Sequence, residues 1–305
     1  MKITRTPDER FVGLPDFAFE AHYAEVPSGD GGVLRVHYLD EGPSDAAPIL
    51  LLHGEPSWCF LYRHMIPELL AAGHRVIAPD LVGFGKSDKP TDPALFSYAA
   101  HVAWMQALIF DVLNLQDITL FGQDWGGLIG LRLLTAEPDR FSRVVIGNTG
   151  LPAGSDETKL AEGFLAWREY ARTVEVFDPG VIVNLGCLSE LDEATIAAYN
   201  APFHDAGSLA AARIFPTLVP ASASDPAHED QLRAWEVLRS FEKPFLCAFS
   251  DSDPVTVGTD KKFRREVPGA KDQEHCTIVG AGHFLQEDQG PQLAKVINHF
   301  IEVTR

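Results

Sequence analysis

Several short, mostly apolar runs recur along the chain, and each is followed within two residues by glycine, aspartate or proline. Runs this short and continuous are typical of strands buried on both faces, as in a parallel sheet. Longer segments of helical character, such as residues 98–113 and 127–136, lie between them. The alternation of strand and helix predicts a doubly wound α/β domain. The predicted strands are residues 48–52, 75–78, 117–121, 143–146, 244–249 and 276–279.

The alternation stops between about residues 151 and 229, where the pattern contains no clear strand. Helical stretches take its place, for example residues 159–173 and 193–199, and prolines separate them. A helical block between two sheet strands is what a cap over the strand ends would look like. We therefore expect a core domain formed by residues 1–150 and 230–305, and a helical cap formed by residues 151–229.

Composition and charge narrow the classes of partner. The chain has 305 residues, of which 46% are hydrophobic, which is enough to bury a sizeable core. The formal net charge is −18, from 43 acidic and 25 basic residues. Such a charge repels phosphate backbones and anionic lipid, so we expect neither nucleic acid nor membrane as a partner. The charge favours neutral or cationic ligands.

The expected location is the cytoplasm. Residues 1–6 lead into acidic and polar positions and not into an apolar stretch, so no signal peptide is expected. No apolar run approaches the roughly 20 residues needed to cross a bilayer. The cysteines form no C-x-x-C pair, which favours reduced thiols over a disulfide or metal site. They are Cys59, Cys187, Cys247 and Cys276.

The strongest chemical signal is G-Q-D-W-G at residues 122–126, directly between the strand 117–121 and a helix. It has the G-x-nucleophile-x-G form of a nucleophile elbow, with Asp124 where esterases carry serine. The nucleophile sits on a tight, strained turn, and side chains on the flanking glycines would clash. The helix N-terminus favours negative charge there. A plain strand–helix turn, with Asp124 as helix N-cap, is the alternative.

A histidine and an acid follow the last two predicted strands. His283 comes after the strand 276–279, and Asp253 after the strand 244–249. The chain order nucleophile, acid, histidine is that of the α/β hydrolases, and an open α/β sheet places its site at the carboxyl ends of its strands. Asp251 is the rival acid. We prefer Asp253 because the extra residues carry it past the strand end and Pro254 fixes the turn.

The segment H-G-E-P-S-W at residues 53–58 follows the strand 48–52. In this fold a loop at that point supplies one backbone N–H of the oxyanion hole, and the residue after the nucleophile supplies the other. Glu55 and Trp125 are therefore the two expected backbone donors.

Over nearly its whole length the chain resembles the haloalkane dehalogenases, in particular the branch whose acid follows the later strand. H-G-x-P and G-F-G-x-S are shared with epoxide hydrolases, whereas Q-D-W-G-G together with H-G-E-P-S-W is far more specific. The resemblance implies an α/β-hydrolase fold with an inserted helical cap. The segments that carry it are RTPDERF at 5–11, HGEPSW at 53–58, VIAPD at 76–80, GFGKSDKP at 83–90, QDWGG at 123–127 and AGHFLQE at 281–287.

An aspartate nucleophile selects the substrate class. Its attack on an ester carbonyl would give an anhydride, which gains nothing. Its attack on a saturated carbon gives an alkyl ester of Asp124 once a leaving group departs, and His283 then activates water against that ester. The leaving group is therefore a halide or the oxygen of an epoxide.

A departing halide needs hydrogen-bond donors but no proton, and the indole N–H is donor-only. Trp125, beside the nucleophile, is one candidate donor, and the resemblance implies Trp167 as the second. Packing of an amphipathic helix is the alternative role for Trp167. In another branch of the family an asparagine after the H-G pair supplies the second donor. Here that position is Glu55, which we expect to be an anion that repels halide.

The other branch also carries its acid after the strand 143–146, where this chain has Asn148. That difference supports Asp253 as the acid.

The resemblance further implies a monomer and an apolar pocket. The sequence offers no metal cluster, so we expect neither metal nor organic cofactor. For each pocket residue, plain core packing is the alternative. The implied pocket residues are Leu128, Phe164, Phe215, Pro216, Val219 and Val255.

Two other functions stay open at this point. Epoxide hydrolases resemble the chain but use two cap tyrosines to protonate the opened epoxide, and the cap region here has Tyr170 and Tyr199. The second open function is that of a non-catalytic binding protein with the same fold. Halide release from a haloalkane, compared with diol formation from an epoxide, separates the two enzyme activities.

Overall fold

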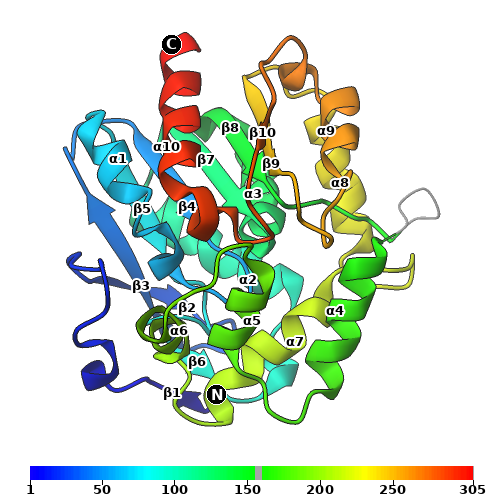
Figure 1. The fold of residues 1–305 in the computed structure, drawn as a ribbon. Helices are drawn as coiled ribbons and strands as arrows, with labels where there is room; N and C mark the ends of the chain where they lie inside the picture. The colour runs from blue at the N-terminus through cyan, green and yellow to red at the C-terminus, as the bar shows by residue number, and fades with distance from the viewer. Residues whose placement is uncertain (155–159, 305) are drawn as a thin grey trace.

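A computed structural model describes residues 1–154 and 160–304. Its centre is an eight-stranded sheet with the strand order β10-β9-β8-β7-β4-β5-β3-β2 (Figure 1). A separate antiparallel pair joins β1 (Ile3–Thr4) to β6 (Lys89–Pro90). The strands of the main sheet are β2 (His22–Pro27), β3 (Val33–Glu41), β4 (Pro48–Leu52), β5 (Arg75–Pro79), β7 (Ile118–Gln123), β8 (Phe141–Gly147), β9 (Phe245–Ser250) and β10 (Cys276–Ile278).

Six neighbouring strands of the sheet run parallel, namely β10, β9, β8, β7, β4 and β5. Each of them coincides with one of the six predicted runs to within a few residues. The mostly parallel α/β fold is therefore confirmed. Strands β2 and β3 form an antiparallel extension beside β5, and the sequence did not predict them. Their side chains alternate between buried and exposed, so they lack the continuous apolar run that marks the others.

Helices cover both faces of the sheet. Successive residues of β4 belong to different apolar cores, because Leu50 packs into one and Leu51 into the other. Helices α1 and α10 pack into the core that contains Leu51, and α2, α3 and α8 into the core that contains Leu50. The helices of these layers are α1 (Ile66–Ala71), α2 (Tyr98–Gln106), α3 (Trp125–Ala136), α8 (His228–Leu238) and α10 (Leu285–Val303), while α9 (Asp260–Glu266) packs beside β9.

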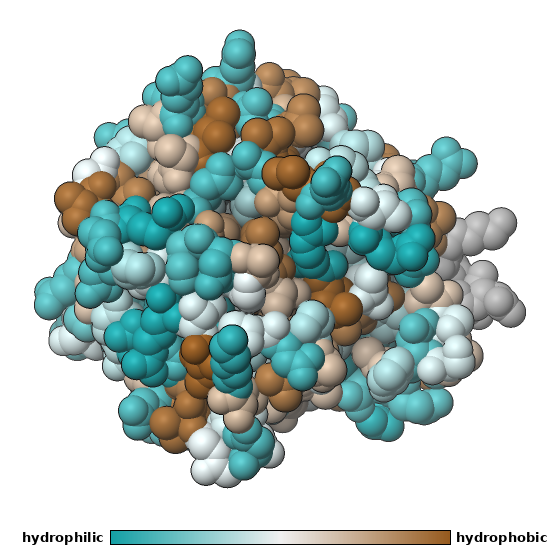
Figure 2. Space-filling model, turned by 90° about the horizontal axis from the view of Figure 1, so that it is seen from below, coloured by the Kyte–Doolittle hydropathy of each residue, from teal (hydrophilic) through white to brown (hydrophobic). Residues whose placement is uncertain are grey.

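Among the described residues, four further α-helices lie between β8 and α8 in the chain and gather at one end of the sheet (Figure 1). Figure 2 views this end of the molecule, where apolar side chains reach the surface between polar ones. The expected helix at 159–173 begins at Glu162 in the structure, and residue 159 lies outside the described residues. The four helices are α4 (Glu162–Thr173), α5 (Pro179–Gly186), α6 (Glu193–Asn200) and α7 (Ala210–Leu218).

Within the described residues, no helix is both long enough and apolar enough to traverse a lipid bilayer.

Candidate active site

Asp124 lies on the turn between β7 and α3, with φ = 51° and ψ = −125°. A positive φ is strained for a residue with a side chain, and such strain is common at functional turns. The surrounding glycines permit the turn. A Cβ on Gly126 would lie 1.7 Å from the carbonyl oxygen of Leu52, and one on Gly122 would lie 2.7 Å from that of Gly126. The structure thus forms the elbow that the sequence motif predicts.

The carboxylate of Asp124 is approached from two sides. The backbone N–H of Glu55 donates to its Oδ1 at 2.8 Å, and His283 Nε2 lies 3.6 Å from its Oδ2. The N–H of Trp125 is the first of helix α3, so the helix ladder does not use it. Asp124 therefore has one backbone donor in place and a ring nitrogen close to its other oxygen.

Asp253, and not Asp251, lies beside His283. Its Oδ1 is 3.1 Å from His283 Nδ1, and the same oxygen accepts the backbone N–H of Val255 at 2.8 Å. The backbone N–H and hydroxyl of Thr256 donate to Oδ2. The carboxylate of Asp251 instead accepts the backbone N–H of Gly280 at 3.1 Å. The carboxylate of Asp251 therefore bonds to a turn, while that of Asp253 bonds to the imidazole.

The charges on the two carboxylates control the protonation of His283. Burial alone would lower the pKa of His283, but the charges and hydrogen bonds of Asp253 and Asp124 outweigh it and raise the pKa to about 10. Burial likewise opposes the ionisation of Asp253, but the His283 charge lowers the pKa of Asp253 to about 2. The interactions with Asp253 and Asp124 therefore favour the protonated form of His283 in the free protein.

Asn148 holds the histidine loop in place, a role that the sequence analysis did not assign. Its Nδ2 donates to the carbonyl oxygens of Gly282 and His283 at 2.9 and 3.0 Å, and its Oδ1 accepts the N–H of Ser250 at 2.9 Å. The carbonyl oxygen of Asn148 also accepts the N–H of Asp124 at 2.9 Å. The sequence signal that could have pointed to this role is the position of Asn148 at the end of a strand beside the elbow.

The side chain of Glu55 is 3% exposed. Burial, and after it the charge of Asp124, raises the pKa of Glu55 well above its usual value, whereas the charge of His283 lowers it. Burial in this setting therefore disfavours ionisation of the carboxyl group. Burial works against the anion that the sequence led us to expect, and the sequence could not reveal how deeply Glu55 is buried.

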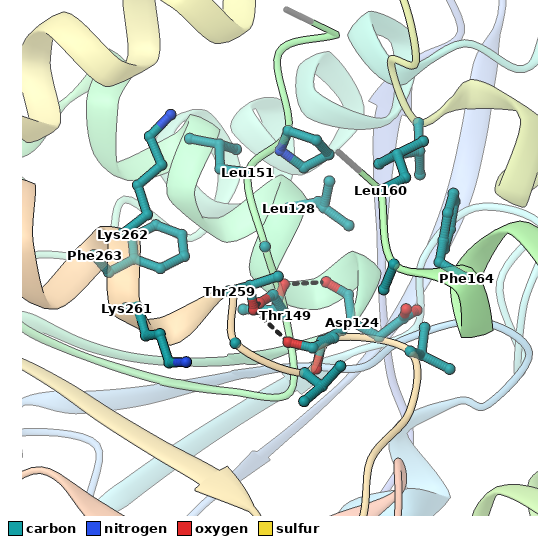
Figure 3. A pocket seen from close by; sticks show the side chains of 18 of the residues that line it. Asp124, Leu128, Thr149, Leu151, Leu160, Phe164, Thr259, Lys261, Lys262 and Phe263 are labelled. Atoms are coloured by element: carbon teal, nitrogen blue, oxygen red, sulfur yellow. Dashed lines mark hydrogen bonds between the residues drawn. The ribbon is translucent and has the colours of Figure 1, made fainter. Parts of the chain in front are cut away.

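A cavity of about 390 Å³ opens at Asp124 (Figure 3). Leu128, Phe164, Val219 and Val255 line it, as the resemblance implies. Figure 3 shows Lys261 and Lys262 on one side of this cavity and Leu160 and Phe164 on the other. The other lining residues are Thr149, Gly150, Leu151, Pro152, Ala161, Trp235, Thr256, Val257, Gly258, Thr259, Phe263 and Arg265.

A second cavity, of about 510 Å³, shares Val255 with the first. Glu55, Trp167 and His283 line it together with Tyr170. Val255 thus borders both cavities. The remaining lining is largely apolar and comes from α4, α5 and the loops that carry the acid and the histidine: Ala166, Ile182, Leu185, Gly186, Cys187, Leu188, Ser252, Pro254, Gly282 and Phe284.

The two expected indole donors occupy different settings. Trp125 is 2% exposed, and its ring stacks on Phe215 with centroids 4.4 Å apart. Trp167 lines the second cavity and packs near Phe177. Phe215 and Pro216 are buried in α7, and among the described residues neither forms part of the lining of the two cavities. Phe215 therefore supports the Trp125 ring.

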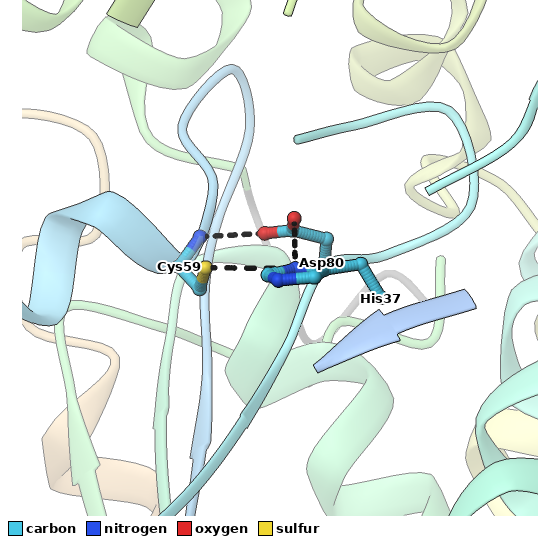
Figure 4. Close-up of side chains that lie close together, drawn as sticks. All are labelled: His37, Cys59 and Asp80. Carbon is cyan, nitrogen blue, oxygen red and sulfur yellow. Dashed lines mark hydrogen bonds and ion pairs between the residues drawn. The ribbon is translucent and has the colours of Figure 1, made fainter. Parts of the chain in front are cut away.

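Among the residues that the structure describes, one cluster could offer metal ligands. Ligand atoms of His37, Cys59 and Asp80 lie within 4.8 Å of one another, and all three residues are buried (Figure 4). The Asp80 carboxylate already accepts from His37 Nδ1 at 2.7 Å, from the Cys59 N–H at 2.8 Å and from the Lys86 N–H at 2.7 Å. A metal would have to displace these bonds, so the donor set fits a structural hydrogen-bonded cluster better than a metal site.

Comparison with known proteins places this geometry in a family. A family model described as the alpha/beta hydrolase fold matches residues 47–289. A haloalkane dehalogenase of Psychrobacter cryohalolentis is 55% identical over 99% of this chain and 98% of its own. A haloalkane dehalogenase of Mycolicibacterium paratuberculosis is 49% identical over 97% of each chain.

The solved structures agree. The tetrameric haloalkane dehalogenase DpaA of Paraglaciecola agarilytica superposes with a TM-score of 0.87, at 32% identity over 97% of each chain. An aspartate on the elbow, with a histidine–aspartate pair beside it, is the arrangement that the family resemblance implies. Identity of this order across nearly the whole of both chains makes this protein a member of the haloalkane dehalogenase family.

Proposed function

We propose that this protein hydrolyses the carbon–halogen bond of haloalkanes, with Asp124 as the nucleophile. The products are an alcohol, a halide ion and a proton. The observation that carries the proposal is the Asp124 carboxylate on a strained elbow, with the Glu55 N–H on one oxygen and His283 Nε2 beside the other. A carboxylate so placed is ready to attack a saturated carbon in the neighbouring cavity.

In the first step an oxygen of Asp124 displaces the halide in line, and the alkyl group becomes an ester of Asp124. The leaving anion needs donors in a dry site, which the indole N–H groups of Trp125 and Trp167 supply. Trp125 is well suited because its ring is buried and held by Phe215.

In the second step His283 removes a proton from water, which attacks the ester carbonyl. The backbone N–H groups of Glu55 and Trp125 stabilise the oxyanion. A change in the pKa of His283 sets the order of the two steps. Esterification removes the charge of Asp124, one of the groups that raise the pKa of His283. His283 therefore becomes a better base only after the ester has formed.

The supporting assignments are part of the same proposal. Residues 151–229 act as the cap and residues 1–150 and 230–305 as the core, and the substrate reacts between them. Leu128, Phe164, Val219 and Val255 provide apolar surface for the alkyl chain. The reaction needs no metal or organic cofactor, and the enzyme works in the cytoplasm.

The oligomeric state is an open part of the proposal. The sequence resemblance predicts a monomer, whereas the DpaA relative is tetrameric. Light scattering on the purified protein decides between the two states.

Epoxide hydrolysis is not favoured. That reaction needs an acid at the alkoxide, and two cap tyrosines were the candidates. The hydroxyl of Tyr199 donates to Glu287 at 2.5 Å and is buried, while Tyr170 lines the second cavity. This leaves one tyrosine where that mechanism uses two.

The test compares halide release with diol formation in the wild-type protein, and it examines ester accumulation in one variant. The wild-type protein should release bromide from 1,2-dibromoethane and form little diol from styrene oxide. His283→Gln should release one equivalent of halide and accumulate the alkyl ester, seen as added mass on the peptide that contains Asp124. Absence of halide release from the wild type would refute the proposal, and so would halide release without an adduct in the variant.

A further inference from the structure

Asp288, in the first turn of α10, joins the segment between α5 and α6 to the loop that carries His283. Its Oδ2 accepts the backbone N–H groups of Leu188 and Gly282 at 2.9 and 2.8 Å. Its Oδ1 accepts the backbone N–H and the hydroxyl of Ser189 at 2.8 and 2.5 Å. Leu188 and Ser189 follow α5, and Gly282 directly precedes His283. One carboxylate therefore holds together two segments that lie far apart in the sequence.

The backbones of the same two segments are also in contact. The carbonyl oxygen of Gly186, the last residue of α5, accepts the N–H of His283 at 2.7 Å. A Cβ on Gly282 would lie 2.4 Å from that carbonyl oxygen, so the close approach needs a glycine at this position. These three residues line the second cavity together with Leu188. The backbone of His283 is therefore held by the segment after α5 as well as by Asn148.

We propose that Asp288 is a positioning residue for the second chemical step, and that it holds His283 in place by tying residues 186–189 of the cap to the loop at 281–284. This inference rests on the proposed function. Among the described residues Asp288 lines neither cavity, so it acts through the backbone of its neighbours. Nε2 of His283 lies 3.6 Å from Oδ2 of Asp124, and a displacement of about 1 Å can slow a reaction about a hundredfold. The first step uses the Asp124 carboxylate without the imidazole, so only the second step should depend on Asp288.

A carboxylate suits the position of Asp288 because it only accepts hydrogen bonds and has room for four of them. Bonds from N–H and O–H groups to an ionised carboxylate are also shorter and stronger than bonds between neutral groups. Alanine at this position would release all four donors. Asparagine would keep one acceptor oxygen and turn its amide N–H groups toward the other pair of donors. Both substitutions should loosen the histidine loop, and alanine should loosen it more.

The test measures the two chemical steps separately in Asp288→Ala. Rapid quenching, with enzyme in excess over 1,2-dibromoethane, follows bromide, which reports ester formation, and 2-bromoethanol, which reports hydrolysis. We expect ester formation within about threefold of wild type and hydrolysis slowed about 10- to 100-fold. Once hydrolysis limits turnover, kcat and KM should fall together while kcat/KM stays within about threefold of wild type, because kcat/KM reports only the steps up to irreversible ester formation.

Asp225→Ala is the matched control. The carboxylate of Asp225 also accepts two backbone N–H groups and a serine hydroxyl, from Ala221 and Ser222. Asp225 lies between α7 and α8, and in the described part of the chain it lines neither cavity. Both steps should keep the wild-type rates in this variant, with all rates referred to the folded fraction from denaturant unfolding. If Asp288→Ala does not fold, Asp288→Asn replaces it and should slow hydrolysis selectively to a smaller extent.

Three results would overturn the inference and leave the proposed function intact: ester hydrolysis at the wild-type rate in the folded Asp288 variant, an equal loss in both steps, or the same selective loss in Asp225→Ala. A wild-type protein that releases no halide would instead refute the proposed function, and the inference with it.

Discussion

The molecule contains two buried histidine–aspartate pairs that look alike and differ in what surrounds them. In one, His283 Nδ1 lies 3.1 Å from Asp253, and in the other His37 Nδ1 lies 2.7 Å from Asp80. The difference is at the second ring nitrogen. His283 Nε2 faces Asp124 and its residue lines a cavity, whereas His37 Nε2 is buried and has no partner among the described residues.

The cysteine of the second cluster shows why proximity alone does not make a catalytic site. The Sγ atom of Cys59 lies 4.0 Å from Nδ1 of His37, the same nitrogen that bonds to Asp80 (Figure 4). One nitrogen cannot both be oriented by the acid and accept a proton from the thiol. Burial also raises the pKa of Cys59 well above its usual value, which disfavours the reactive thiolate. The Asp80 cluster therefore stabilises the fold.

The same substitution in the two pairs should have opposite consequences. Asp253→Asn removes the charge that orients and stabilises the His283 imidazolium. We expect kcat to fall about 10²- to 10⁴-fold and the alkyl ester to accumulate. Steady-state kinetics and intact-protein mass measure these effects. A kcat within threefold of wild type would remove Asp253 from the mechanism.

Asp80→Asn should affect stability and not chemistry. It places an amide against backbone N–H groups that now donate to a carboxylate, and it leaves His37 without its acid. Breaking a buried pair in this way costs about 3–5 kcal/mol. Denaturant unfolding measures the loss. The folded fraction should keep kcat within about threefold of wild type, and a large selective loss of kcat would assign the cluster a role in the reaction.

The His283 pair should also give stability a defined pH dependence. The folded pKa of His283 is raised to about 10, so its contribution is complete below its ordinary pKa and is lost as pH rises toward 10. The folded pKa of Asp253 is lowered to about 2, so its contribution is lost only in strong acid. The Tm advantage of wild type over His283→Gln should shrink between pH 7 and pH 10 by at least about 2–4 °C, the shift expected for 1 kcal/mol. A constant difference would contradict the raised pKa.

The smallest effect is expected for Cys59→Ala. The substitution removes a buried sulfur atom and should cost about 1 kcal/mol of stability, measured by denaturant unfolding. The Cys59 backbone N–H still donates to Asp80, so kcat should stay within about twofold of wild type. A tenfold loss of kcat would mean that the thiol participates in the reaction after all.

The parallel strands and the elbow could be predicted because their signals are local. Buried strands are continuous apolar runs, and the elbow needs glycines at fixed offsets from Asp124. The contact of Asp253 with His283 was also predictable, since two further residues carry this carboxylate past the end of β9, while its role as the acid stays a prediction.

What the sequence could not give depends on packing between distant segments. The raised pKa of Glu55 follows from its burial, which no local pattern encodes. The support that Phe215 gives to Trp125 joins α7 to the start of α3, and the bonds from Asn148 to the histidine loop span more than a hundred residues. The outermost strands β2 and β3 escaped prediction because one of their faces is polar.

The most direct test of the central claim, covalent attack by Asp124, is a single turnover in water enriched in oxygen-18, with enzyme in excess over 1,2-dibromoethane. If water hydrolyses an ester at Cγ of Asp124, one heavy oxygen enters that carboxylate and the released alcohol carries ordinary oxygen from the enzyme. Mass spectrometry of the peptide that contains Asp124 and of the released alcohol measures the oxygen-18 content of each. A heavy alcohol together with an unlabelled Asp124 would show that water attacks the substrate directly, and would contradict the account.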